Sequence, residues 1–270
     1  MSGGTMASES WVVSGPQVIE VDDVTALRVQ VVGGRADVVA GDQPGARVEV
    51  HSVEGRPLEV SLVDGELRVG YAFTLSGWEG FLERFRNFRD RDRVDVSIAV
   101  HREVATKLGT VSADGLLSDV VEDASVSTVS GSLVTDHTRG RLTASTVSGE
   151  VVVRDHTGDL RLHSVSGELA ASGHLTVVQA NTVSGGLALD LTAPTSSVTA
   201  STVSGDVTVR VPHDKGVRAK LQSVSGRLVL DDLEHRGSGG RSVDLQSGDG
   251  ACYVSATTVS GDVTVLRAGA

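Results

Sequence analysis

Seven serines recur at one position of a short phrase, and a serine hydroxyl is a possible nucleophile. Each is the middle residue of Val-Ser-Gly, and they are Ser130, Ser148, Ser166, Ser184, Ser204, Ser225 and Ser260. A serine nucleophile requires a base and oxyanion-stabilising donors at one particular place in a protein. A serine that returns at regular intervals therefore indicates a structural role. The sequence predicts no enzymatic activity from this pattern.

Two copies of Asp-His-Thr raise the possibility of metal binding. The pairs Asp136-His137 and Asp155-His156 occupy equivalent turns of consecutive repeats. Two imidazoles and two carboxylates could together bind zinc. However, Asp-His-Thr is also a good turn sequence, and an exposed histidine beside an aspartate usually only solvates a corner. We therefore predict no metal and no other cofactor, with these four residues as the only ones that could form a metal site.

A calcium site is also considered and set aside. Asp159, Asp206 and Asp262 each follow a glycine, as aspartates do in calcium-binding β-rolls. Those sites require additional glycines and several oxygen ligands for each ion. The additional glycines are absent here, and the sequence contains no Walker loop, paired-cysteine zinc pattern or HExxH motif.

The phrase containing the serines is repeated at a nearly constant interval. It first appears as Val111-Ser112-Ala113, and the next four copies follow at intervals of 18 residues, the last ending at Gly185. Later copies follow after 20, 21 and 35 residues. Short alternating stretches such as "EVVVRD" and "DVTVRV" come after the glycines and are typical of strands. A period near 20 predicts an all-β solenoid of stacked coils, each of about 18–21 residues.

This repeat predicts which side chains stack inside the coils. We expect Val129, Val147, Val165 and Val183 to form one internal ladder, and Leu133, Val151, Leu169 and Leu187 to form a second. The glycine would permit a tight bend or a positive φ. The serine would hydrogen-bond into its own turn or to the serine above it. The phrase is therefore interpreted as a corner of the coil.

Composition divides the chain into four regions. Residues 1–17 are expected to be a flexible N-terminus, and residues 18–71 a small β region with a hairpin turn at Asp64-Gly65. Residues 72–93 contain all four phenylalanines and are predicted to form one amphipathic helix over about 77–89. Residues 94–270 form the predicted solenoid.

The aromatic stripe of this predicted helix has three possible roles. Its members are Trp78, Phe81, Phe85 and Phe88. Solenoid ends expose unpaired strand edges, so a helix placed before the first coil would serve as a cap. Alternatively, the stripe binds a protein partner or a second copy of the chain. Binding to a membrane surface is less favoured because the arginines are nearly balanced by acids.

Several phrases resemble a known family. The stretches "TVSGDVTV" (202–209 and 258–265) and "STVSGEVVV" (145–153) resemble the adhesin-like toastrack β-strand-repeat family, domain of unknown function 4097. The "WEGFLERFRNF" segment resembles members of the actinobacterial type. The resemblance covers about residues 18–267 and implies a non-catalytic scaffold or interaction module, in some members connected with envelope stress. Many members carry a signal sequence or membrane helix, and neither is recognisable here.

Charge and composition limit the remaining possibilities. A net charge of −11 argues against nucleic acid as a partner, because phosphate binding requires a positive surface. No stretch approaches about 20 apolar residues, so no integral membrane segment is expected. One cysteine cannot form an intramolecular disulfide. We therefore expect a cytoplasmic scaffold that binds an unknown protein partner or itself; the alternative is an adhesin-like, surface-binding protein exported by an unrecognised route.

Overall fold

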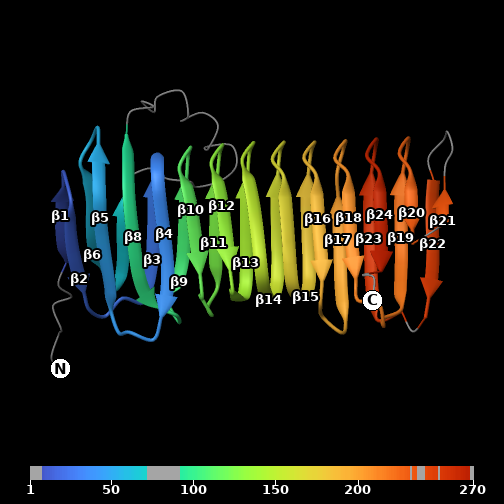
Figure 1. Ribbon diagram of the computed structural model, residues 1–270, viewed down its shortest axis with the longest axis horizontal. Coiled ribbons are helices and arrows are strands. Elements are labelled where there is room, and N and C mark those ends of the chain that lie inside the picture. The colour runs from blue at the N-terminus through green and yellow to red at the C-terminus, as the bar shows by residue number, and fades with distance from the viewer. Residues whose placement is uncertain (1–7, 72–91, 232, 236–240, 249, 268–270) are drawn as a thin grey trace. The chain divides into compact units, whose positions relative to one another are not determined.

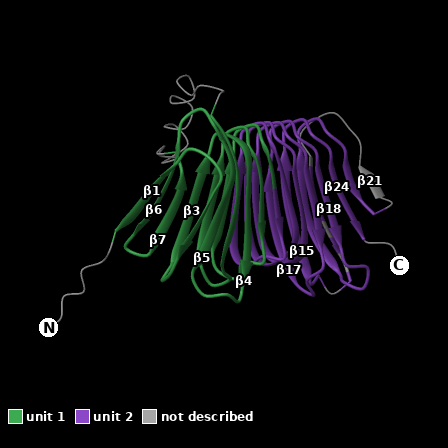
Figure 2. Cartoon of the chain, turned by 60° about the vertical axis from the view of Figure 1, so that its left-hand side comes forward, with its two compact units in different colours: residues 1–133 green, residues 134–270 purple. Residues whose placement is uncertain are grey.

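The computed structural model describes residues 8–71, 92–231, 233–235, 241–248 and 250–267. The chain forms two compact units, Met1–Leu133 and Val134–Ala270 (Figure 2). Every regular element within the described residues is a β-strand (Figure 1). The all-β class predicted from the sequence is therefore confirmed for this part of the chain.

The strands form because apolar and polar residues alternate. In β18 (Val207–Val211), for example, the three valines are buried and Arg210 is exposed. Successive side chains of a strand point to opposite faces, so alternation places one set inside and the other outside. The interior consists mainly of Val, Leu and Ala, which agrees with the low aromatic content of 3%.

Unit 1 contains two series of hydrogen-bonded strands. The first series runs β1 (Glu9–Val13), β6 (Leu58–Val63), β7 (Glu66–Gly70), β3 (Ala26–Val31), β9 (Ala105–Thr110) and β11 (Ala124–Thr128). The second runs β2 (Gln17–Val21), β5 (Ala46–Glu54), β8 (Arg93–His101), β4 (Gly33–Gly41) and β10 (Asp114–Ser118). Pairing is antiparallel among β1, β6 and β7 and among β2, β5 and β8, and parallel thereafter.

These pairings differ from the predicted regions. Strand β1 begins at Glu9, inside the segment that we expected to be a flexible N-terminus. Strands β3 and β4 lie between β7 and β9 and between β8 and β10, so the N-terminal strands are layers of the same stack. In the chain, unit 1 ends at residue 133 and includes β8 to β11, because strands before residue 93 pair with strands after it.

Unit 2 also contains two series, and most of its pairings are parallel. The first runs β13 (Arg139–Thr146), the second half of β14 (Glu150–Ser164), the second half of β15 (Leu169–Thr182), β17 (Ser196–Ser201), β23 (Cys252–Thr258), β19 (Val217–Ser223) and β22 (Arg241–Ser247). The second runs the first halves of β14 and β15, then β16 (Leu187–Leu191), β18, β24 (Val263–Arg267), β20 (Leu228–Leu230) and β21 (Leu233–His235). The outermost pairings, of β22 and β21, are antiparallel. Strand β12 (Ser132–Asp136) contains the boundary between the units.

The coils of unit 2 are not stacked in chain order. Strands β23 and β24 come last in the sequence, yet they lie between β17 and β19 and between β18 and β20. The identical stretches at residues 202–209 and 258–265 are consequently neighbours, with Val207 opposite Val263 and Val209 opposite Val265. Two identical stretches can pack in register because each side chain lies opposite one of the same volume. This favours the position of β24 next to β18.

One predicted ladder is confirmed and the other is wrong. Val151, Leu169 and Leu187 are in register and buried, and Leu133 is also buried. The corner valines instead face outward: Val129, Val147 and Val165 are partly exposed, and Val183 is 47% exposed. The residue before each valine occupies the interior, as Thr146 and Thr182 show. The chain reverses direction at the corner, which interrupts the inward and outward alternation of the strands.

Candidate functional site

Each repeated corner is closed by a buried hydroxyl three residues before the glycine. The glycine N–H donates to this hydroxyl at distances between 2.8 and 3.3 Å. The seven accepting residues are Thr128, Thr146, Ser164, Thr182, Thr202, Ser223 and Thr258. A buried amide without a hydrogen-bond acceptor destabilises the folded state. The hydroxyl therefore stabilises the corner by accepting from the buried glycine N–H.

The serine of Val-Ser-Gly has a different structural task. Its Oγ donates to a valine carbonyl in the adjacent coil, at 3.1 Å from Ser166 to Val147 and 3.2 Å from Ser184 to Val165. The same arrangement recurs at Ser204, with 3.4 Å to Val183. These hydroxyls join one coil to the next, as a repeated structural serine should. This differs from both expected alternatives, which were a bond within the serine's own turn and a bond to the serine of the adjacent coil.

The two serines of one corner offer a direct comparison. Replacement of Ser164 by alanine should lower the free energy of unfolding by about 1–3 kcal/mol, because it leaves the buried Gly167 N–H without its acceptor. Replacement of the exposed Ser166 should cost less than about 1 kcal/mol, because water can solvate the Val147 carbonyl. Urea denaturation followed by circular dichroism measures both. Equal losses would contradict the assignment of the two roles.

The structure brings three of the four predicted metal-site residues together. Nδ1 of His137 lies 3.2 Å from Oδ1 of Asp136, and its Nε2 lies 3.8 Å from Oδ2 of Asp155. One ligand atom from each residue lies within 4.8 Å of the other two. His137 and Asp155 are exposed, and Asp136 is partly exposed. The cluster is therefore open to solvent and to ions.

His156 does not join this cluster. Its side chain is fully buried, with Nδ1 2.9 Å from Thr138 Oγ1 and Nε2 3.3 Å from the Asp159 carbonyl oxygen. Burial lowers the pKa of the imidazole, which therefore favours the neutral form. The equivalence of the two Asp-His pairs in sequence is thus broken in the fold: one histidine faces solvent and the other fills the interior.

The aspartates considered for calcium are engaged with neighbouring coils. Asp159 Oδ1 accepts a hydrogen bond from Thr176 at 3.0 Å, and Asp206 Oδ1 accepts one from the Asp262 amide at 2.8 Å. Asp262 also forms an ion pair with Arg227 at 2.6 Å. Asp159 is therefore bonded to Thr176, whereas Asp262 interacts with both Asp206 and Arg227. This arrangement stabilises the stack of coils and does not form a ring of ligands around one ion.

The aromatic residues predicted to bind a partner lie outside the described residues. These are Trp78, Phe81, Phe85 and Phe88, together with the predicted capping helix over about 77–89. Their binding role stays a prediction of the sequence.

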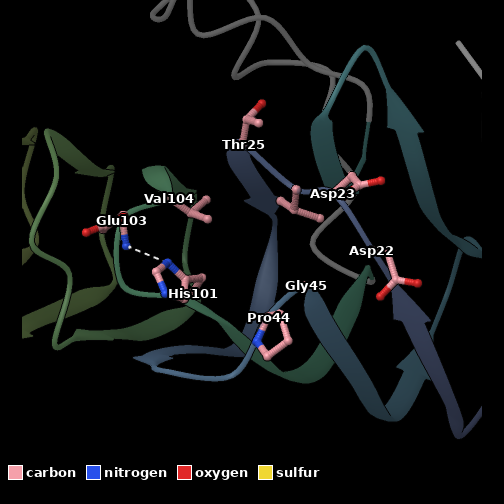
Figure 3. A pocket seen from close by; sticks show the side chains of 9 residues that line it. Asp22, Asp23, Thr25, Pro44, Gly45, His101, Glu103 and Val104 are labelled. Carbon is pink, nitrogen blue, oxygen red and sulfur yellow. Dashed lines mark hydrogen bonds between the residues drawn. The ribbon is translucent and has the colours of Figure 1, made fainter. Parts of the chain in front are cut away.

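A hollow of about 660 Å³ lies in unit 1 and was not predicted (Figure 3). Its lining comes from the turns after β2, β4 and β8 and includes Asp22, Asp23, His101 and Glu103. His101 Nδ1 accepts a hydrogen bond from the Glu103 amide at 3.3 Å. Sequence reasoning missed this hollow because the three turns are far apart in the chain and come together only through the pairing of β3 with β9 and of β4 with β8.

The first series of unit 2 presents rows of polar side chains outward, and we call this surface the polar face. One row contains Thr143, Arg161, Gln179, Thr199, Ser255 and Lys220, in register across the strands. The adjacent row contains Ser145, His163, Asn181, Ser201, Thr257 and Gln222. Neighbouring members are separated by about 4.8 Å, the distance between paired strands. The face therefore offers hydrogen-bonding groups at regular intervals.

Comparison with known proteins agrees with this architecture. A family model described as Toastrack DUF4097 matches residues 86–266. A Parabacteroides distasonis structure, of a protein proposed to bind lipid, has 12% identity and a TM-score of 0.52, covering 96% of this chain and 98% of that chain. Another from the same organism, of a protein proposed to be an adhesin, has 14% identity and a TM-score of 0.51, covering 98% of each. At these identities the two structures show a common fold.

The curated proteins contain no match to the sequence. Within the part of the chain that the structure describes, we find no helix with the length and apolar character that a membrane span requires.

Proposed function

Since this chain belongs to the Toastrack DUF4097 family, we propose that it is a non-catalytic scaffold that binds a protein partner on the polar face of unit 2. The observation that carries this proposal is that two sets of repeated polar side chains have different surroundings. The corner hydroxyls and serines are bonded to the backbone of the stack, whereas the polar rows point away from it. What the repeat offers to another molecule is therefore this outward surface.

The chemistry of the polar face suits a protein. Gln179, Thr199 and Ser201 are exposed and lie on the central strands β15 and β17. Amide and hydroxyl groups both donate and accept hydrogen bonds, so they match the peptide groups and polar side chains of a partner. A protein interface typically contains about ten direct hydrogen bonds, and a periodic polar surface provides many groups that can form them.

The aromatic residues between 72 and 93 provide a possible second contact. Aromatic residues are enriched at the buried cores of protein interfaces, and this segment contains Trp78, Phe81, Phe85 and Phe88. In the proposal, these residues contribute apolar anchoring and the polar face contributes recognition. A role in stress signalling or regulation in the cytoplasm is the cellular setting that we propose.

A cross-linked pull-down of the tagged chain from its native host tests the proposal. Thr199→Lys places a long cation in the middle of the polar face, and Ala188→Lys places the same group at an exposed position of β16 on the other series. Both variants are first shown to be folded by circular dichroism. We expect one specific protein to be captured by the wild type and by Ala188→Lys, and to be lost with Thr199→Lys.

Other outcomes decide between the remaining interpretations. A partner that is retained by Thr199→Lys but lost when Phe81, Phe85 and Phe88 are changed to serine assigns binding to the aromatic segment and overturns the proposal for the polar face. Recovery of the chain alone would favour self-association. Fractionation of the host cells tests the adhesin-like alternative, which requires the protein to be found at the cell surface.

A further inference from the structure

We propose that Asp136, His137 and Asp155 form a binding site for one divalent transition-metal ion, of which Zn²⁺ is the best match. The site belongs to unit 2 and lies at the turn that precedes β13 and at the register shift of β14 between Val153 and His156. None of its three residues belongs to the rows of the polar face or to residues 72–93.

The backbone holds the two turns together. The His137 amide donates to the Arg154 carbonyl at 3.2 Å, which places His137 beside Asp155 of the adjacent coil. Both residues have the left-handed conformation, with φ of 50° for His137 and 47° for Asp155. The following strands are paired in register, with Gly140 opposite Gly158. The relative position of the imidazole and the Asp155 carboxylate is therefore set by the stack of coils.

The buried side chain of His156 helps to fix the positions of His137 and Asp155. It directly follows Asp155, and its ring is buried between Thr138 and the Asp159 carbonyl. Thr138 in turn directly follows His137. The interior contact therefore links the residues next to both exposed ligands, and the Asp155 and His137 side chains project from an anchored pair of turns.

The donor set favours a transition metal over calcium or magnesium. Zn²⁺ binds imidazole nitrogen and carboxylate oxygen at about 2.0–2.2 Å in tetrahedral geometry. One ligand atom of each residue lies within 4.8 Å of the other two, and rotation of these side chains would bring the three atoms to one ion. The ion would bind one ring nitrogen of His137, so the carboxylate that now faces the other nitrogen would have to turn toward it. Calcium requires six to eight oxygen ligands, and magnesium prefers oxygen and water. Three protein ligands leave the fourth position of zinc to water.

The alternative interpretation of the cluster is an ion pair, in which a protonated imidazole lies between two carboxylates and no metal binds. The two cases differ in their response to acid. Metal binding requires a neutral imidazole and therefore weakens in acid. An ion pair requires the protonated imidazole and is therefore favoured by acid. Binding measured at two pH values separates them.

Isothermal titration of the full chain with ZnCl₂, after removal of metal by EDTA and desalting, tests the site. At pH 7.5 we expect one equivalent to bind with a dissociation constant on the order of micromolar. At pH 5.5 the affinity should be measurably lower, because protons compete with the metal for the imidazole nitrogen. His137→Asn keeps a residue that tolerates the left-handed conformation, and it should also lower the affinity at least about tenfold.

Two further variants make the result decisive. His213→Asn removes another exposed histidine that stands beside an aspartate, Asp214, and it should bind zinc as the wild type does. Asp155→Asn should weaken binding even if His137→Asn proves unstable. A rise in Tm on addition of zinc, present in the wild type and absent in Asp155→Asn, gives a second readout. Unchanged binding by both cluster variants, or no binding by the wild type at about 100 µM zinc, overturns the proposal.

Discussion

Replacement of Gly185 by alanine is expected to lower the free energy of unfolding of unit 2 by about 3 kcal/mol or more. A Cβ at this position would overlap the carbonyl oxygen of Gly167 and lie 2.7 Å from its carbonyl carbon. Neither atom can move easily, because both belong to a corner that is hydrogen-bonded to its neighbours. The loss should be visible as a lower midpoint in urea denaturation.

The adjacent glycine provides a matched control. A Cβ on Gly186 would lie 2.5 Å from Oε2 of Glu168, which is the end of a flexible, exposed side chain. That carboxylate can rotate away, so Gly186→Ala should be neutral or stabilise the unit by up to about 1 kcal/mol through the unfolded chain. Two alanines with similar effects would contradict the argument, since it depends on backbone contact at position 185 alone.

This contrast also shows what the sequence could predict about the glycines. The period of the repeat indicated correctly that each glycine marks a corner. It did not indicate the reason, because Gly185 has no positive φ and is required for close approach to the next coil. The glycines of the half-period have a positive φ, of 136° at Gly158 and 87° at Gly140, and a Cβ on Gly158 would in addition overlap the Gly140 carbonyl oxygen. A residue type alone does not distinguish a conformational requirement from a steric one.

The sequence predicted the strands and coils better than the order in which the coils are stacked. Alternation and period depend on local sequence, so the strands, the β-solenoid coils and the ladder through Val151 and Leu169 followed from them. The position of β23 between β17 and β19 depends on contacts between distant residues. One signal was present, namely the identity of residues 202–209 and 258–265, which indicates that these stretches stack directly. No comparable signal marks the insertion of β3 between β7 and β9.

The candidate metal site was predicted in part for a related reason. The Asp-His repeat correctly pointed to neighbouring turns, and the structure places His137 near Asp155. The two pairs, however, are 19 residues apart, whereas the surrounding corners repeat every 18. His137 and Asp155, separated by 18, are the equivalent residues, and both have the left-handed conformation. The extra residue moves His156 one position along the chain, so it points inward.

Removal of the last coil should damage strands that precede it in the sequence. A chain that ends at Gly250 lacks β23 and β24, which lie between β17 and β19 and between β18 and β20. The buried side chains of Val254 and Val265 would be lost from the middle of the stack. We expect amide protons of β19 and β20 to lose protection by roughly a hundredfold or more in hydrogen exchange, because these strands would lose a parallel partner.

Comparison of two truncated chains, one ending at Gly250 and one at Arg267, tests the order of the coils. A chain that ends at Arg267 retains β24 and should exchange as the full chain does. If the coils were stacked in chain order, ending at Gly250 would only shorten the stack, and β19 and β20 would remain protected by β17, β18 and β22. Addition of a peptide of residues 251–267 should restore protection to the shorter chain, since the gap between β17 and β19 fits that segment. Protection of β19 that survives truncation, with no response to the peptide, would show that the inserted coil does not hold this end of the unit together.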